Sequence, residues 1–376
     1  MKRSLIGIPC LRNRLIVCGI AAISLMSGHV LAQSNVTVYG VVDAAVEYSR
    51  QGDGGMTRLQ SGGYQGNRLG FRGSEDLGGG VRAVFNLENG FAVDNGTFTQ
   101  GGRLFGRQAF VGLEGAWGVI TAGRHQSPYY YSMLNQDAFQ WAMNGGLLAL
   151  TRTSGAARAT SPLLSVYGTL GRIDNSVLYT SPVVGGLSAR LIYGFGEVAG
   201  DSAAGRAAGA SLRYQNGPLD LNVVYIENND AFDRGGQKAM NIGGSYALGK
   251  AKVYAGYLRE TSRTATSAVA ALPQETRFDL YNIGLRFQTT ANLTLIGQVI
   301  RLRDRSEGLT IDRDGTSIAF GGEYALSKRT LVYASVGSIE NQNGSSYSLG
   351  TGTAAGGPVT GDPRARAASI GVRHTF

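Results

Sequence analysis

The residue types that carry most enzyme chemistry are scarce in this 376-residue chain. Both cysteines, Cys10 and Cys18, lie in the first 32 residues, and beyond these the only histidines are His125 and His374. No histidine pair has metal-ligand spacing, and no Gly-x-Ser-x-Gly elbow marks a nucleophilic serine. Residues 244–251 nearly spell a phosphate-binding loop, but Ala251 stands where a Ser or Thr is required. The sequence therefore predicts no catalytic, cofactor-binding or metal-binding residues.

The N-terminal segment predicts export. Four basic residues precede an apolar run over residues 15–26, and Val30 and Ala32 suit a cleavage site. The run is too short to span a membrane, so residues 1–32 are predicted to be a secretory signal peptide, with an uncleaved anchor as the alternative. Residues 33–376 then form the expected domain. The chain has net charge +9, to which the four basic residues contribute +4, and no Lys/Arg run elsewhere indicates a nucleic-acid partner.

Alternation of apolar and polar residues dominates residues 33–376. Along residues 36–47 one alternate set is apolar or glycine, while the other includes Thr37, Asp43 and Glu47. The last nine residues follow the same rule and end on Phe376. A period of two places the sets on opposite faces of a strand, and no helical period of comparable length competes. A water-soluble β-protein and a transmembrane β-barrel both fit this composition.

Aromatic residues favour the barrel. Five expected strands end on a ring just before a short turn or the C-terminus: Tyr214, Tyr246, Phe287, Tyr324 and Phe376. Rings that recur at one end of alternate strands form a girdle where the hydrocarbon core meets the headgroups. The alternative is core rings of a soluble sandwich or propeller, but a propeller would repeat at more even intervals.

The alternating segments predict an all-β fold, a 16-stranded antiparallel transmembrane β-barrel. Closure removes every sheet edge, as a bilayer requires, and a barrel of this size leaves room for an aqueous channel. The expected strands begin near Val36, Asn67, Val81, Arg107, Gly118, Arg172, Leu187, Ala207, Leu219, Lys238, Ala251, Thr276, Leu293, Gly315, Thr330 and Arg364.

One connection, between Arg124 and Gly171, is long and lacks clear alternation. Loops of this length are usually functional or disordered. Its content of rings and aliphatic residues, such as Tyr129, Tyr130 and Tyr131, argues against disorder. We expect an ordered loop that folds into the lumen and narrows it, and the alternative is an exposed surface loop.

Several motifs resemble one known family. Residues 67–91 (NRLGFRGSEDLGGGVRAVFNLENGF), 106–113, 174–182, the opening 36–43 and the ending 371–376 are similar to general trimeric porins of the β-proteobacterial type. The resemblance covers all of residues 33–376. It implies an outer-membrane homotrimer surrounded by lipid and lipopolysaccharide, with a third loop constricting each water-filled channel for small hydrophilic solutes and ions. It also implies that Phe376 is an assembly signal read by the barrel assembly machinery.

In this family, lumen arginines face acids of the third loop. By motif match Arg68 and Arg124 fall on positions of the arginine cluster, Arg72, Arg82 and Arg107 are nearby candidates, and Arg172 is a weaker one. The third loop here departs from acid-rich examples, because its only acid is Asp137, against Arg152 and Arg158. The expected pore-lining residues are Arg68, Arg72, Arg82, Arg107, Arg124, Asp137, Arg152, Arg158 and Arg172.

This balance of charge predicts a preference for small anionic solutes, with neutral solutes also passing. Fixed positive charges in a narrow passage raise the local concentration of anions. Any one of these arginines could instead be held in an ion pair with a neighbouring strand. Acids expected to face inward and oppose the preference are Asp43, Glu47, Glu88, Asp220, Asp279 and Glu323.

Two other functions compete with a channel. An outer-membrane enzyme such as a phospholipase needs a Ser–His dyad on the lipid face, where His374 is the only plausible histidine. A structural or adhesive barrel would have a plugged lumen. Single-channel conductance separates a porin from both.

Overall fold

The structure, a computed structural model, describes residues 35–376 except 52–53, 142, 148–151, 154–169, 234, 264–274, 307–313, 344, 346 and 350–363. The expected signal peptide and Arg158 lie outside the described residues. Residues 34–376 form one compact unit.

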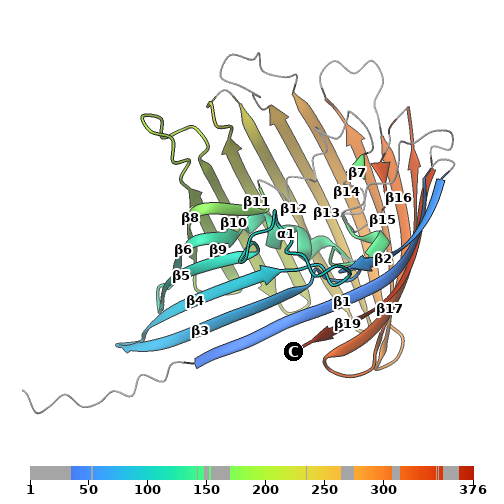
Figure 1. Cartoon of the computed structure of the whole chain (residues 1–376), viewed down its shortest axis with the longest axis horizontal. Helices are drawn as coiled ribbons and strands as arrows, with labels where there is room; N and C mark the ends of the chain where they lie inside the picture. Colours follow the sequence, from blue (N-terminus) through green and yellow to red (C-terminus); the bar gives the residue numbers. More distant parts are fainter. Residues whose placement is uncertain are drawn as a thin grey trace, which may run out of the picture. The chain divides into compact units, whose positions relative to one another are not determined.

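A single antiparallel sheet closes on itself and makes a barrel (Figure 1). Its strands are β1 (Asn35–Gln51), β2 (Gly54–Ser61), β3 (Arg68–Gly78), β4 (Val81–Gly90), β5 (Gln108–Gly115), β6 (Gly118–Gln126), β8 (Arg172–Thr180), β9 (Leu187–Gly194), β10 (Ala207–Asn216), β11 (Leu219–Asn229), β12 (Gly236–Leu248), β13 (Ala251–Arg263), β14 (Thr276–Gln288), β15 (Leu293–Asp304), β16 (Gly315–Ala325), β17 (Thr330–Asn341) and β19 (Arg364–Thr375). The barrel closes where β1 pairs with β19, from Val41 opposite Thr375 to Gln51 opposite Ala365.

The described part of the sheet has 17 strands, but two of them share one position in the barrel. β2 pairs with the second half of β1, from Ala44 onward, and β3 pairs with the first half, up to Val41. Residues 62–67 interrupt this position. The barrel thus has sixteen strand positions, as predicted, and the expected starts lie within two residues of those observed.

The strand β2 was not expected, because residues 54–61 lie in what reads as a glycine-rich loop. The glycines that flank this segment make its short alternation hard to recognise. Strand β1 continues to Gln51, and its residues from Ala44 to Gln51 pair with β2.

The two faces of each strand differ as the alternation predicts. On β14, Ile283, Leu285 and Phe287 are exposed on the outside, while Asn282 and Gly284 are buried on the inside. The five rings expected to form a girdle also lie on the outward face, at the end of the barrel that carries the short turns. Asp279 shares the outward face with Tyr281, so its expected inward position is wrong.

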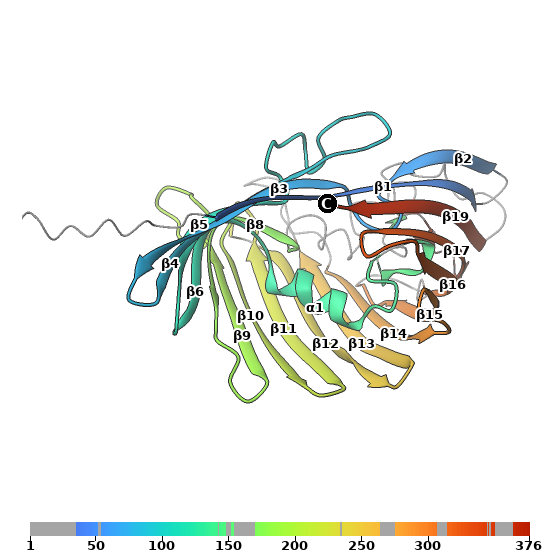
Figure 2. The same cartoon turned by 90° about the horizontal axis from the view of Figure 1, so that it is seen from below.

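The described part of the long third connection lies inside the barrel. It contains α1 (Pro128–Gln136), η1 (Met143–Gly145) and β7 (Arg152–Thr153), which pairs with β18 (Tyr347–Ser348). The Ser127 side chain caps α1 by accepting a hydrogen bond from the Tyr130 amide at 3.2 Å. Figure 2 shows α1 within the ring of strands, packed against β10 to β13, while η1 packs against β16, β17 and β19. The expected constricting loop is therefore confirmed. Across the described residues, no helix is long and apolar enough to span a membrane.

Candidate functional site: the lumen constriction

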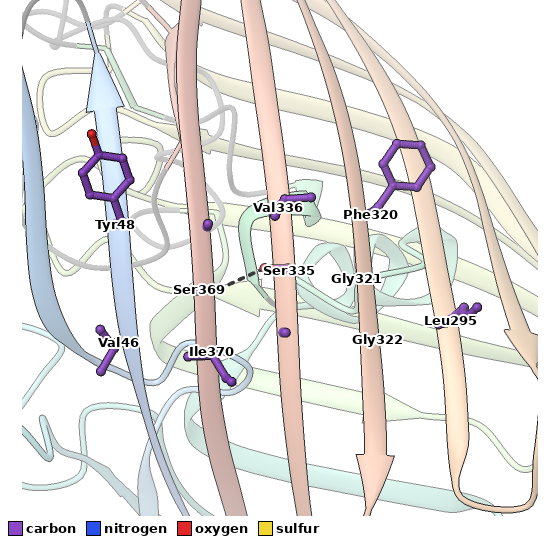
Figure 3. A pocket seen from close by; sticks show the side chains of 12 residues that line it. Val46, Tyr48, Leu295, Phe320, Gly321, Gly322, Ser335, Val336, Ser369 and Ile370 are labelled. Atoms are coloured by element: carbon purple, nitrogen blue, oxygen red, sulfur yellow. Dashed lines mark hydrogen bonds between the residues drawn. The ribbon is translucent and has the colours of Figure 1, made fainter.

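The outer wall carries a hollow that offers no chemistry. It is an apolar groove of about 590 Å³ over β1, β15, β16, β17 and β19 (Figure 3). Small residues such as Gly322 and Ala368 lie between larger side chains, including Tyr48 and Phe320. The only hydrogen bond drawn among its lining residues joins Ser335 and Ser369 at 3.0 Å, and both side chains are buried.

The histidines do not form a reactive centre. His125 is buried, and its ring nitrogens contact the hydroxyls of Ser176 at 2.8 Å and Thr121 at 2.9 Å. Nδ1 of His374 contacts the Thr330 hydroxyl at 2.9 Å. No group of three or more potential metal ligands occurs in the part of the chain that the structure describes.

Three arginines that lie far apart in the sequence converge on Tyr130 of α1. The Arg172 guanidinium lies over its ring at 5.4 Å. Burial acts to raise the pKa of the Tyr130 phenol, but the positive charges of Arg107, Arg172 and Arg68 together lower it below its usual value. Because α1 packs mainly against β10 to β13, Tyr130 places the third loop next to these three arginines of the opposite wall.

Two of these arginines support the wall and do not line the opening. Arg107 and Arg172, both predicted to line the pore, are 4% and 3% exposed and lie beneath the surface of the lumen wall. The Arg107 Nε donates to Glu88 Oε1 at 2.6 Å, and the Tyr39 hydroxyl donates to the other carboxylate oxygen at 2.9 Å. Arg107 fits beneath the surface because Gly66 has no side chain: a Cβ there would lie 3.3 Å from Arg107 Nη1.

Arg124 shares an acid with an arginine that was not predicted. Its Nη1 lies 2.5 Å from Asp174, and its Nε donates to the Gly106 carbonyl at 2.8 Å. Arg103, from the β4–β5 connection, contacts the same carboxylate at 2.7 Å. One acid between two arginines leaves net positive charge. The one sequence signal for a lumen role of Arg103 is its closeness to the 106–113 motif.

Several inward cations have no carboxylate oxygen at ion-pair distance within the described residues, among them three on β3 and β9. Arg68 is half-buried and donates to the Gly66 carbonyl at 3.1 Å. The exposed Arg72 lies over the Tyr39 ring at 5.2 Å, and Arg190 of β9 lies over the Tyr131 ring at 4.1 Å. Within the described residues, none of the three has a carboxylate oxygen at ion-pair distance. Arg190 was missed, although its alternation with Leu191 places it on the inside.

Comparison with known proteins agrees with this barrel and lumen. The model of the Gram-negative porin family matches residues 19–344. The chain belongs to this family. Outer membrane porin protein 32 of Delftia acidovorans is 28% identical over 100% of both chains, and an outer membrane porin protein of Bordetella pertussis is 28% identical over 95% of this chain and 98% of its own. The solved structure of an anion-selective porin from Comamonas acidovorans has a TM-score of 0.75 and 25% identity, and the match covers 92% of this chain and 100% of that chain.

The porin is thus a channel of the cell outer membrane that small hydrophilic solutes and ions cross by passive diffusion. Its family is non-enzymatic, which removes the phospholipase alternative.

Arg82 of the porin is not at the constriction. It follows the β3–β4 turn directly, and its Nη2 lies 2.5 Å from Glu114, next to the β5–β6 turn. Both side chains are partly exposed at the short-turn mouth of the barrel. Arg82, predicted as a pore-lining candidate, faces the lumen at this mouth, because a strand of ten residues carries inward side chains from one mouth to the other.

Asp137, the one acid of the porin's third loop, does not face the opening either. It is fully buried and accepts hydrogen bonds from the amides of Phe139, Trp141 and Leu147 and from the Gln298 side chain, at 2.8 to 2.9 Å. Burial raises the pKa of Asp137, and these donors act in the opposite direction. Asp137, predicted to line the pore, therefore shapes the loop and fastens it to β15 from beneath the loop surface. The described backbone of Arg152 lies in β7, and Arg158 lies outside the described residues.

Proposed function

We propose that this porin passes anions in preference to cations and serves the diffusion of small anionic and neutral solutes. The observation that carries the proposal is the group of inward arginines, Arg68, Arg72 and Arg190, held by rings and a carbonyl instead of carboxylates. The similarity to the anion-selective porin from Comamonas acidovorans supports it.

Anion preference follows from positive charge that has no acid at ion-pair distance. Ion pairs such as Arg107–Glu88 and Arg286–Glu323 contribute little net potential at a distance. Uncompensated guanidinium groups in a passage with low-dielectric walls focus a positive potential there. Anions then enter more often than cations, while neutral solutes are limited by size alone.

The direct test is the zero-current potential of the purified porin in a planar bilayer with a KCl gradient. We expect the sign that chloride preference produces, with a smaller magnitude at high salt because screening shortens the reach of the charges. A potential of the sign that potassium preference produces would contradict the proposal. An absence of ion conductance would contradict the channel itself.

Three further assignments belong to this proposal. We propose that the signal peptide is residues 1–32 and the barrel domain 33–376, that the porin is a homotrimer in lipid and lipopolysaccharide, and that the barrel assembly machinery reads its C-terminus. The family motifs at both ends of the chain support them, as does the limit of the compact unit near residue 34.

Deletion of Phe376 is expected to lower the amount of assembled porin several-fold. Its amide and carbonyl exchange hydrogen bonds with Gly40 at 3.2 and 3.1 Å, and its ring covers Gly40 so closely that a Cβ there would lie 2.3 Å from it. The ring thus completes the joint between the last strand and the first. Heat-resistant migration of outer-membrane extracts measures the effect. The control Phe376→Tyr keeps the ring and should assemble normally. Normal assembly of the deletion variant would contradict the role of Phe376 as an assembly signal.

A further inference from the structure

The wall beneath the third loop carries a row of very small inward residues. On the neighbouring strands β12 to β17, glycine, alanine or an amide side chain stands at about one height of the barrel. The row, here called the glycine belt, consists of Gly243, Gly256, Asn282, Gly284, Gln298, Ala319, Gly321 and Gly337. Glycine inside a strand weakens the strand, and it often marks a place where another segment approaches closely.

The residues of the belt are neighbours across the sheet. Gly243 stands opposite Gly256, and Gly284 stands opposite Gln298. Gln298 in turn stands opposite Ala319 on β16. The small residues therefore form one continuous strip that crosses the strands, and they are not scattered over the lumen wall.

The third loop occupies the space that side chains of the belt would need. A Cβ on Gly284 would lie 2.6 Å from the Cβ of Ala138, and a Cβ on Gly321 would lie 2.8 Å from Cε1 of the Phe139 ring. Carbon atoms in relaxed contact are about 3.5–4.0 Å apart. The loop therefore lies closer to the wall than any residue larger than glycine would permit at these two positions.

The glycines at the two ends of the belt receive the loop in the same way. A Cβ on Gly243 would lie 2.8 Å from the Cβ of Gln136, the last residue of α1. A Cβ on Gly337 would lie 2.7 Å from the carbonyl oxygen of Asn144 in η1. Both loop residues are fully buried. The fit thus extends from the end of the helix to η1.

The amide side chains of the belt hold the loop at this depth. Gln298 Oε1 accepts a hydrogen bond from the Ala138 amide at 2.9 Å, and its Nε2 donates to the Gly145 carbonyl at 2.9 Å. Asn282 Nδ2 donates to the Gln136 carbonyl at 2.7 Å. These bonds join wall and loop directly, so the amides pull the loop down where the glycines make room for it.

We propose that the glycine belt sets the width of the channel and therefore the largest solute that passes. The third loop narrows the lumen, so a shift of the loop away from the wall narrows the opening further. Glycine keeps the loop as deep as the backbone of the wall allows. The belt residues act through the loop, as positioning residues. The size limit that they set does not depend on the ion preference of the lumen.

Gly284→Ala tests the belt by adding one methyl group beneath the loop. Relaxing its contact with Ala138 moves the loop by about 1 Å toward the lumen. We expect a shift of this size to lower the single-channel conductance by about one-third. The uptake of neutral sugars by porin-containing liposomes should fall more steeply as the sugar becomes larger.

The double variant A138G/G284A moves the methyl group from the loop to the wall. It should recover most of the parent's conductance, because the two groups that collide are no longer both present. A general loss of stability would not be repaired by a second substitution to glycine. Heat-resistant migration shows that each variant is assembled.

Gly321 and Gly322 provide a matched pair on β16. A Cβ on Gly322, which faces outward, would lie 3.6 Å from Leu295, an ordinary contact. G321A should therefore lower the conductance, while G322A should match the parent. The proposal is overturned if assembled G284A and G321A keep the parent's conductance and size limit, or if A138G/G284A recovers nothing. Larger and noisier currents in G284A would also overturn it, because they would show that the loop is released from the wall.

Discussion

The triple variant R68E/R72E/R190E is expected to convert the channel from anion preference to cation preference. Each parent residue is an inward cation that contacts no carboxylate, so each substitution replaces an uncompensated positive charge with a negative one. Fields inside charged clefts alter local ion concentrations by about tenfold or more. We expect the chloride-to-potassium permeability ratio to fall by at least about tenfold and to pass below one. Zero-current potentials under a KCl gradient measure it.

Two further variants serve as controls for the glutamate variant. R68Q/R72Q/R190Q removes the charges without reversing them and should give a nearly unselective channel. R82E changes a charge at the short-turn mouth, where Arg82 is paired with Glu114, and should shift the ratio much less. If the glutamate variant migrates normally as a heat-resistant species and its zero-current potential keeps the parent's sign, the anion preference arises from other residues.

Asp137→Ala is expected to release the third loop while the barrel stays closed. The substitution leaves three buried amides and the Gln298 side chain without their acceptor, and each unsatisfied buried donor costs about 1–3 kcal/mol. None of the ladder hydrogen bonds between strands uses this carboxylate. Single-channel currents should become larger and noisier, and limited proteolysis should cut the loop while the barrel remains resistant.

The matched variant Asp137→Asn keeps one acceptor oxygen in the same shape. It should therefore show an intermediate current and slower cleavage than Asp137→Ala. If the alanine variant has the parent's conductance and protease resistance, Asp137 does not fasten the loop.

Alternation predicted the barrel well because every strand meets the same two environments. Sixteen positions, their starts and the lining loop follow from a period of two and from one long break in it. The interruption of the second strand position could not be predicted from alternation. Asp43 holds residues 62–67 inward by accepting hydrogen bonds from the amides of Tyr64 and Gln65, and no local sequence pattern indicates these contacts. Asp279 was placed on the wrong face because polar residues stand on both faces once a strand leaves the apolar band.

The site was predicted less completely than the fold. A motif gives a position in the chain, but the exposure of Arg107 and Arg172 depends on what packs over them from elsewhere. Tyr130 is such a residue, and it comes from a loop without regular alternation. The partners of Asp137 lie two, four and ten residues away and on β15, so its burial follows only from the loop conformation.

The burial of Asp137 determines how the channel treats solutes that carry both signs of charge. Opposed acidic and basic walls would create a field across the passage, and such a field turns a zwitterion and aligns its dipole moment. Here Tyr130 and Tyr131 of α1 lie against Arg172 and Arg190, and the one acid of the loop, Asp137, is buried. The third loop therefore sets no acid against these arginines, and we expect the channel to sort solutes by their net charge with little alignment of their dipoles.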